Sequence, residues 1–414
     1  MHSDILIVGA GLAGLHCALR LSEKFPKKTI RILESSLIAG GRVHTIHHST
    51  GHIEAGAGRI PESHPLVSYY CDKYSLTKRP LDNESLFLYD AGLVQENLWS
   101  TCIRILEKTL ADVPKSVLCR YTISEILTKL FDAEVAEDMM YFFPYRSELK
   151  TLRADVALHS FANEFSNKES FYVIQEGLSS LIRGMETELE TRGVPILYEH
   201  RVTGMGSMDS FPMSLTVKAD TQKTFTAGKI IFAVHANALR SIRPFTAYPI
   251  LKHLKMEPLL RTYATFPTPA WFTNMPRVIT ANALRHIIPI NAKKGVIMIS
   301  YTDAADTKVW EQLRKKGDHA LARDIMKELR TLFPMKTIPN LESISTYSWE
   351  EGATYWTPGL YDPVKESNAI MRPFPTRLPD VYVCGESYSM KQAWMEGALE
   401  HADAMLERYF FRTH

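Results

Sequence analysis

The fold is decided by the stretch Ile5-Leu6-Ile7-Val8-Gly9-Ala10-Gly11-Leu12-Ala13-Gly14. Its first four residues form an apolar run of strand type, and apolar residues then recur at helical spacing from Leu12 until Pro26 ends the helix. A second short run of β type follows from Thr29 to Leu33. The sequence therefore predicts a strand, a glycine turn, a helix and a parallel strand, which together open a doubly wound α/β sheet.

The glycines Gly9, Gly11 and Gly14 have the spacing G-x-G-x-x-G at the junction of strand and helix. Glycine permits the tight turn, and backbone N–H groups at the positive end of the helix can approach a pyrophosphate there. Glu34 ends the second strand, where its carboxylate can accept hydrogen bonds from the ribose of an adenine dinucleotide. FAD and NAD share this pattern, and a purely structural glycine turn with a surface glutamate is the alternative.

Two further groups of motifs distinguish between these dinucleotides. Gly40-Gly41-Arg42-Val43 with Thr45, followed by Glu54-Ala55-Gly56-Ala57, resembles the G-G-R-x-x-T and [DE]-x-G-A segments of the flavin amine oxidase superfamily. Near the C-terminus, Cys384-Gly385-Glu386 and Trp394-Met395-Glu396-Gly397-Ala398 are similar to its G-E and G-W-M-E-G-A motifs. The resemblance runs from about residue 4 to residue 408 and implies that the cofactor is FAD.

The resemblance also implies which residues hold the cofactor. A helix that starts near Met395 directs its N–H groups and its dipole toward electron-rich flavin oxygens. No cysteine stands at Gly352 or Ala353, so we expect FAD to be bound non-covalently. The expected cofactor contacts are Gly9, Gly11, Leu12, Ala13, Gly14, Glu34, Ser35, Gly41, Arg42, Gly56, Ala57, Gly58, Arg59, Val202, Trp349, Gly385, Glu386, Trp394, Met395 and Ala398.

The segment from Gly56 to Pro61 indicates the subgroup. It is similar to the G-x-M-R-x-P of L-amino-acid oxidases, which places Arg59 where that subgroup clamps the substrate carboxylate. A planar guanidinium offers two parallel donors that match a carboxylate. A structural arginine paired with Glu62 is the alternative, and the apolar segment His286-Ile287-Ile288-Pro289 counts against this subgroup, because its members supply a tyrosine there. The expected substrate contacts are Arg59, Trp356, Ala393 and Trp394.

Arg261 departs from the family pattern and is the expected catalytic residue. Most members of the family have a lysine that holds a water near flavin N5, whereas this chain has Arg261 in Arg261-Thr262-Tyr263. Arginine keeps the positive charge but cannot give up a proton as lysine can. The sequence therefore predicts altered reactivity with O₂, which we nevertheless expect to be the electron acceptor.

These motifs predict an FAD-dependent L-amino-acid oxidase that transfers a hydride from Cα to the flavin and gives an imino acid and hydrogen peroxide. Two alternatives stay open. The first is an FAD-dependent monoamine or polyamine oxidase, although Ala353 stands where such an enzyme has one aromatic wall of its substrate cage. The second is a flavin-binding protein whose catalysis has decayed.

Composition limits the partners. The chain has 414 residues and a formal net charge of +2, from 48 Lys and Arg against 46 Asp and Glu, and shows no long basic run. We therefore expect a folded chain that binds a small molecule and neither nucleic acid nor membrane, with a homodimer left open. The N-terminus enters the first strand without the segments of a signal peptide, so we expect a cytoplasmic location.

Scattered cysteines and histidines give no sign of a metal site. Five cysteines lack the spacing of metal ligands or of a disulfide framework, and the cluster of His44, His47 and His48 lacks a helical i, i+4 pair. We therefore expect no metal.

The order of elements predicts two interleaved domains. A Rossmann-like FAD-binding domain comprises residues 1–64, 190–245 and 335–414. An α+β substrate domain comprises residues 65–189 and 246–334, and its part 65–189 is expected to be helical because amphipathic stretches follow one another there.

Overall fold

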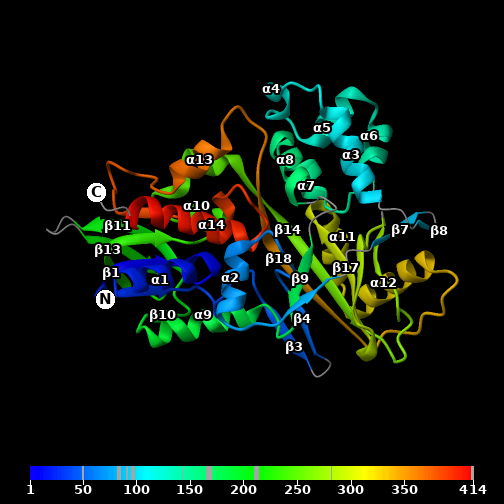
Figure 1. Cartoon of the computed structure of the whole chain (residues 1–414), viewed down its shortest axis with the longest axis horizontal. Coiled ribbons are helices and arrows are strands. Elements are labelled where there is room, and N and C mark those ends of the chain that lie inside the picture. The colour runs from blue at the N-terminus through cyan, green and yellow to red at the C-terminus, as the bar shows by residue number, and fades with distance from the viewer. Residues whose placement is uncertain are drawn as a thin grey trace.

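The computed structural model describes residues 1–48, 51–81, 85–89, 92–94, 98–141, 143–164, 170–208, 214–280 and 282–411. Within these residues the strands form two seven-stranded sheets, one three-stranded sheet and one two-stranded sheet. Figure 1 shows the two large sheets side by side, with both chain termini at the outer end of the first sheet.

The first large sheet has the strand order β10-β2-β1-β13-β12-β11, and β19 pairs with β13. Strand β1 pairs in parallel with both β2 and β13, whereas β11, β12 and β13 are antiparallel to one another in turn. This confirms the predicted α/β class with a doubly wound sheet. The strands are β1 (His2–Val8), β2 (Ile30–Leu33), β10 (Ile196–Leu197), β11 (Val202–Met208), β12 (Ser214–Ala219), β13 (Thr224–Phe232) and β19 (Val381–Val383).

Helices cover this sheet because its central strands are apolar on both faces. Leu6, Ile7 and Ile231 are completely buried, as expected for parallel strands with helices on either side. Helix α1 packs against both α14 and α9, and α2 also packs against α14. The covering helices are α1 (Leu12–Lys24), α2 (Pro65–Lys73), α9 (Ser179–Thr191) and α14 (Met395–Leu406), with α10 (Ala236–Arg240) and α13 (Pro363–Ile370) nearby.

The second large sheet has the order β18-β14-β17-β16-β15-β7-β8. Its two longest strands pair antiparallel from Leu254 opposite Trp356 to Thr265 opposite Ser343. Helices α11 (Thr307–Arg314) and α12 (Asp318–Leu332) bury Trp310 and Ile325 in the core beside it. The strands are β7 (Ser85–Tyr89), β8 (Gly92–Val94), β14 (Leu254–Thr265), β15 (Arg277–Thr280), β16 (His286–Asn291), β17 (Val296–Asp303) and β18 (Ser343–Trp356).

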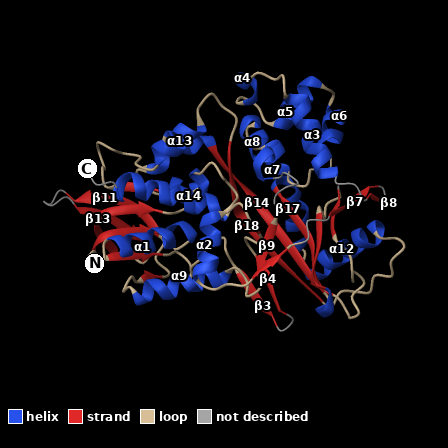
Figure 2. Cartoon of the chain, viewed as in Figure 1, coloured by secondary structure: helices blue, strands red, loops and turns tan. Residues whose placement is uncertain are grey.

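A helical region lies beside one end of the second sheet (Figure 2). It contains α3 (Leu98–Leu110), α4 (Lys115–Leu118), α5 (Ile123–Leu130), α6 (Ala133–Met140), α7 (Arg146–Lys150) and α8 (Ala154–Glu164). This confirms the expected helical insertion into an α+β part of the chain. None of the helices among the described residues has both the length and the apolar composition that crossing a bilayer requires.

The range 65–189 is not wholly helical, which the sequence did not predict. Strand β9 (Phe171–Ile174) joins β5 (Ile60–Pro61) and β6 (Lys78–Pro80) in the three-stranded sheet, and β7 and β8 join the second large sheet. Such short strands have no periodicity of their own, because distant pairing partners stabilise them. The remaining hairpin is β3 (Thr45–His48) with β4 (Gly51–Glu54). The exact domain boundaries stay a prediction.

Candidate functional site

A cavity of about 1890 Å³ lies between the two large sheets. A typical pocket for one small ligand has roughly 300–1,000 Å³, so this cavity can hold a dinucleotide together with a second, smaller molecule. Its lining comes from the carboxyl ends of β1, β2 and β13, from the start of α14, and from strands β14 to β18 of the second sheet.

The glycine turn forms one end of the cavity. Gly9 has φ +103°, and a Cβ at Gly14 would lie 1.9 Å from the carbonyl oxygen of Gly9, so both positions require glycine. A Cβ at Gly11 would meet no atom within 4 Å, because this residue faces the open cavity. Helix α1 begins at the next residue without a side-chain cap, which leaves its first N–H groups available to a phosphate.

Glu34 stands beside this turn. One carboxylate oxygen accepts a hydrogen bond from the backbone N–H of Ala10 at 2.7 Å, and the other accepts from the N–H of Ser36 at 2.8 Å and from the Ser35 hydroxyl at 3.2 Å. The side chain is buried but lines the cavity. These donors fix the carboxylate in place, and the oxygen bonded to Ala10 keeps a lone pair for a ribose hydroxyl.

Arg42 and the buried Glu386 form an ion pair at the cavity wall. The guanidinium donates to the Glu386 carboxylate at 2.7 Å and to the carbonyl oxygen of Gly352 at 3.1 Å. Glu386 also accepts from the backbone N–H of Ala393 at 2.7 Å and from that of Thr354 at 3.2 Å. The ion pair therefore connects three segments that are far apart in the sequence, around Arg42, Thr354 and Glu386.

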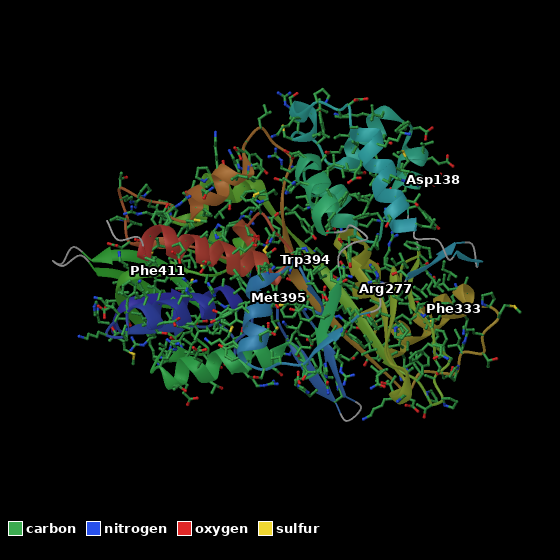
Figure 3. The ribbon with its side chains drawn as sticks, viewed as in Figure 1. Asp138, Arg277, Phe333, Trp394, Met395 and Phe411 are labelled. Carbon is green, nitrogen blue, oxygen red and sulfur yellow. The ribbon has the colours of Figure 1, made fainter. Side chains whose placement is uncertain are left out.

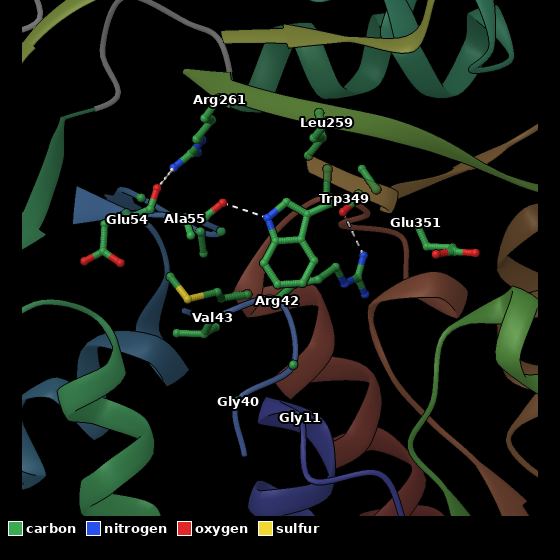
Figure 4. A pocket seen from close by; sticks show the side chains of 18 of the residues that line it. Gly11, Gly40, Arg42, Val43, Glu54, Ala55, Leu259, Arg261, Trp349 and Glu351 are labelled. Carbon is green, nitrogen blue, oxygen red and sulfur yellow. Dashed lines mark hydrogen bonds between the residues drawn. The ribbon is translucent and has the colours of Figure 1, made fainter. Parts of the chain in front are cut away.

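The middle of the cavity is lined by Trp349 and Arg261 (Figure 4). The indole N–H of Trp349 donates to the carbonyl oxygen of Ala55 at 2.7 Å. The Arg261 guanidinium donates to the carbonyl oxygen of Glu54 at 2.9 Å and lies over the Tyr301 ring, 4.7 Å from its centre. Both side chains thus hold the segment that follows β4, and Arg261 brings a positive charge to the cavity wall.

Arg59 lines the end of the cavity that is opposite the glycine turn. Its guanidinium donates to the Tyr145 hydroxyl at 3.3 Å and lies over the Phe171 ring at 4.3 Å. Among the residues that the structure describes, no carboxylate lies within ion-pair distance of Arg59, so the alternative pairing with Glu62 is wrong. A cation with only neutral partners in a cavity is suited to bind an anionic group.

Trp394 and Ala393 stand next to Arg59. The Trp394 ring stacks on Phe171 at 6.3 Å and lies 5.9 Å from the guanidinium. Ala393 has φ +66°, an uncommon conformation that its hydrogen bond to Glu386 supports. Figure 3 labels Trp394 and Met395 near the centre of the molecule, where α14 begins facing the second sheet.

Two expected site residues lie outside the cavity lining. Gly14 sits beneath the turn, against Gly9. Trp356 is completely buried, and its indole N–H donates to the carbonyl oxygen of Ser389 at 3.0 Å, so the expectation that Trp356 contacts the substrate is corrected. Tyr355 lines the cavity instead.

The remaining expected residues all line the cavity. They are Gly9, Gly11, Leu12, Ala13, Glu34, Ser35, Gly41, Arg42, Gly56, Ala57, Gly58, Arg59, Val202, Arg261, Trp349, Gly385, Glu386, Ala393, Trp394, Met395 and Ala398. Their collection from many segments into one cavity is what the motifs imply for a bound dinucleotide.

Several lining residues were missed in the sequence. Tyr145, Tyr301 and His286 form a cluster of rings, with centres 5.1 Å apart for Tyr145 and His286 and 5.5 Å apart for His286 and Tyr301. Tyr145 lies between two short helices and carries no motif. The sequence signal for this cluster was His286, a histidine at the start of a mostly apolar strand.

Comparison with known proteins agrees with this geometry. Residues 12–404 match the family of flavin containing amine oxidoreductases. YobN of Bacillus subtilis is 23% identical, covering 96% of this chain and 92% of its own length. The flavin-dependent L-tryptophan oxidase RebO of Lentzea aerocolonigenes is 34% identical over 27% of this chain and 24% of its own.

A solved structure supports the same assignment at the level of the fold. Putrescine oxidase bound to putrescine superposes with a TM-score of 0.77 at 15% identity, covering 100% of both chains. The glycine turn, Glu34 and the uncapped start of α1 supply what a flavin dinucleotide needs. The chain therefore belongs to the family of flavin-containing amine oxidoreductases, and it is a flavin-dependent oxidoreductase.

Proposed function

We propose that this enzyme oxidises the Cα–N bond of an L-amino acid to an imino acid, which water then converts to a 2-oxo acid and ammonia. One observation carries the proposal: the Arg59 guanidinium lines the substrate end of the cavity, and no carboxylate of the described chain pairs with it. An amino acid supplies such a carboxylate, whereas a simple amine does not.

The cofactor is held by residues at the opposite end. The glycine turn and the first N–H groups of α1 would hold the diphosphate of FAD, and Glu34 would accept a hydrogen bond from a ribose. When bound, the flavin supplies a two-electron acceptor for the hydride that leaves Cα. A Cβ at Gly352 would lie 2.5 Å from Leu259 Cγ, so a cysteine does not fit there, which supports non-covalent binding.

The side chains of the substrate end orient the amino acid. Arg59 would take its carboxylate, the Trp394 ring would exclude water beside it, and the backbone carbonyl near Ala393 and Trp394 would accept a hydrogen bond from the amine. Positioning of this kind can supply much of the rate enhancement. A substrate that binds with a neutral amine needs no basic side chain.

We further propose that O₂ takes the electrons from the reduced enzyme and leaves as hydrogen peroxide. Arg261 supports this step by keeping a fixed positive charge near the middle of the cavity, where Glu54 and Tyr301 hold its guanidinium. A positive charge favours the formation of an anionic product of O₂.

Anaerobic mixing with L-amino acids and with their decarboxylated amines tests the proposal. We expect the flavin absorbance near 450 nm to bleach with at least one amino acid and to change much more slowly with the matching amine. Equal rates for an amino acid and its amine would overturn the proposal and favour an amine oxidase. Acid precipitation should release the flavin into the supernatant if it is bound non-covalently.

A further inference from the structure

The backbone of Ala393 has a conformation that alanine rarely adopts. Its φ angle is +66°, in the left-handed region, and the residue lines the cavity directly before Trp394 and the start of α14. A Cβ atom disfavours this region, so a residue other than glycine keeps it only where the surrounding contacts enforce it. Residues held in this way are often found at functional sites.

The carboxylate of Glu386 supplies the contact that holds Ala393. Its Oε1 accepts from the N–H of Ala393 at 2.7 Å and from that of Thr354 at 3.2 Å. Its Oε2 accepts from the Arg42 guanidinium at 2.7 Å and from the Thr354 hydroxyl at 3.2 Å. A carboxylate has about four acceptor directions, so these protein donors can occupy all of them. The side chain is only 6% exposed, which keeps competing water away from these bonds.

The two oxygens of Glu386 serve different parts of the cavity. Arg42 follows Gly40, whose N–H donates to the carbonyl oxygen of Ala10 at 2.9 Å, so its segment lies against the glycine turn of the cofactor end. Ala393 belongs to the substrate end, where the proposed function places the amine. A single buried carboxylate therefore joins the segment expected to hold the cofactor to the segment expected to orient the substrate.

Other contacts fix the neighbours of Ala393 but not its own dihedral angles. The backbone N–H of Trp356 donates to the side-chain oxygen of Gln392 at 2.8 Å, and the amide nitrogen of that side chain donates to the carbonyl oxygen of Ser387 at 2.9 Å. These bonds hold the loop in place. Without the bond to Glu386, the peptide groups on either side of Ala393 could rotate toward the negative φ that alanine prefers.

We propose that Glu386 is a positioning residue, which holds Ala393 in the left-handed conformation and so sets the direction of the backbone carbonyl that receives the substrate amine. Its bond to Arg42 ties this setting to the cofactor segment. The inference rests on the proposed function for the place of the amine, and it applies to an amino acid or to a simple amine alike. Because Arg59 binds the carboxylate separately, the loss of Glu386 should affect the rate of hydride transfer more than the affinity for the substrate.

Anaerobic flavin reduction at increasing substrate concentration separates the limiting rate from the apparent dissociation constant. Glu386→Gln should lower the limiting rate at least about tenfold and change the dissociation constant less than about threefold, because the amine is misdirected while Arg59 keeps its contact. Glycine adopts a positive φ without steric cost, so adding Ala393→Gly to Glu386→Gln should raise the limiting rate again by at least about threefold. Glu400→Gln is the matched control, since it removes a surface carboxylate that pairs with Lys391 of the same loop, and it should behave as the unaltered enzyme.

A second variant removes the N–H donor alone. Lactic acid incorporated in place of Ala393 exchanges this N–H for an ester oxygen and leaves Glu386 paired with Arg42. The flavin should stay bound, and the limiting rate should fall at least about tenfold here too. An unchanged limiting rate in this variant overturns the inference, and so does a loss in Glu386→Gln that Ala393→Gly does not relieve.

Amide hydrogen exchange gives a readout without turnover. The N–H of Ala393 should exchange at least about tenfold faster in Glu386→Gln than in the unaltered enzyme or in Glu400→Gln, and equal protection would overturn the inference. The rate measurements use whichever amino acid or amine reduces the unaltered enzyme fastest. If only amines do so, the proposed function fails while the variants still decide the role of Glu386. If amino acids do so and all variants match the unaltered enzyme, the inference fails and the proposed function stands.

Discussion

Replacing Arg59 by alanine should abolish most amino-acid oxidation while leaving the protein folded. In the free enzyme the guanidinium makes one long hydrogen bond, 3.3 Å to Tyr145, one contact with the Phe171 ring at 4.3 Å and a more distant one with the Trp394 ring at 5.9 Å. A hydrogen bond contributes about 0.5–1.5 kcal/mol and a cation–π contact about 0.5–1 kcal/mol. The free energy of unfolding should therefore fall by only about 1–2 kcal/mol.

The effect on the substrate should be much larger. Removing one partner of a desolvated, hydrogen-bonded charge pair costs roughly 2–5 kcal/mol. Since about 1.4 kcal/mol corresponds to a factor of ten, the second-order rate constant for anaerobic flavin reduction should drop between about 30-fold and a few thousand-fold. Arg59→Lys should recover little of this loss, because a point charge cannot replace the paired donors of a guanidinium.

Stopped-flow absorbance near 450 nm measures that rate constant directly. Arg183→Ala, which removes an exposed arginine of α9 bonded only to Ser180 among the described residues, is the matched control and should behave as the unaltered enzyme. A decarboxylated substrate should be equally slow with and without Arg59. An Arg59→Ala enzyme that holds flavin and still reacts with the amino acid at nearly the original rate would falsify the carboxylate clamp.

Three other changes give distinct expectations. Arg261→Lys should alter the rate of reoxidation by O₂ more than the rate of anaerobic reduction, since charge is kept while a transferable proton is gained; the reverse pattern would place this residue on the substrate. Gly11→Ala should leave stability almost unchanged but weaken FAD binding, whereas Gly14→Ala should destabilise the fold itself; equal melting temperatures of the two apoproteins would contradict this. Burial lowers the pKa of His401 to about 4 from the ordinary 6.5 while its Nδ1 accepts from the N–H of Gly385 at 3.4 Å. The stability that neutral His401 gives the folded protein should be complete above pH 6.5 and should fall by up to about 1.4 kcal/mol per pH unit as the pH drops toward 4. Urea unfolding of His401→Gln should therefore show a flatter pH dependence than that of the unaltered protein. An unchanged slope would contradict this.

The cofactor end could be predicted from the sequence because its determinants are local. The turn from Gly9 to Gly14 needs glycine for steric reasons that lie within a few residues, and Glu34 follows one strand later. The C-terminal motif around Glu386 was found in the same way. Short-range geometry of this kind leaves a sequence pattern that can be read without knowing the rest of the fold.

The substrate end could be predicted only in part because it depends on register. Ala353 pairs with Glu257, but Trp349 pairs with Leu259, so β18 contains two more residues than β14 across this interval. An irregularity of this kind bends the strand and changes which of its residues reach the cavity. Tyr355 lines the cavity and Trp356 lies in the core, and no pattern in the sequence shows where the irregularity falls.

The same end of the cavity argues against a protein that merely binds flavin. Among the described residues, Arg59 has no carboxylate partner, and neither ring nitrogen of the buried His286 has a hydrogen-bond partner. Leaving a buried polar group unsatisfied costs about 1–3 kcal/mol, a sizeable part of a net stability of 5–15 kcal/mol. The glycine turn, Glu34 and the start of α1, where we expect the dinucleotide to be anchored, lie at the other end of the cavity. A buried imidazole that faces a cavity without a partner is explained by a ligand that satisfies it, and we propose that this ligand is the substrate.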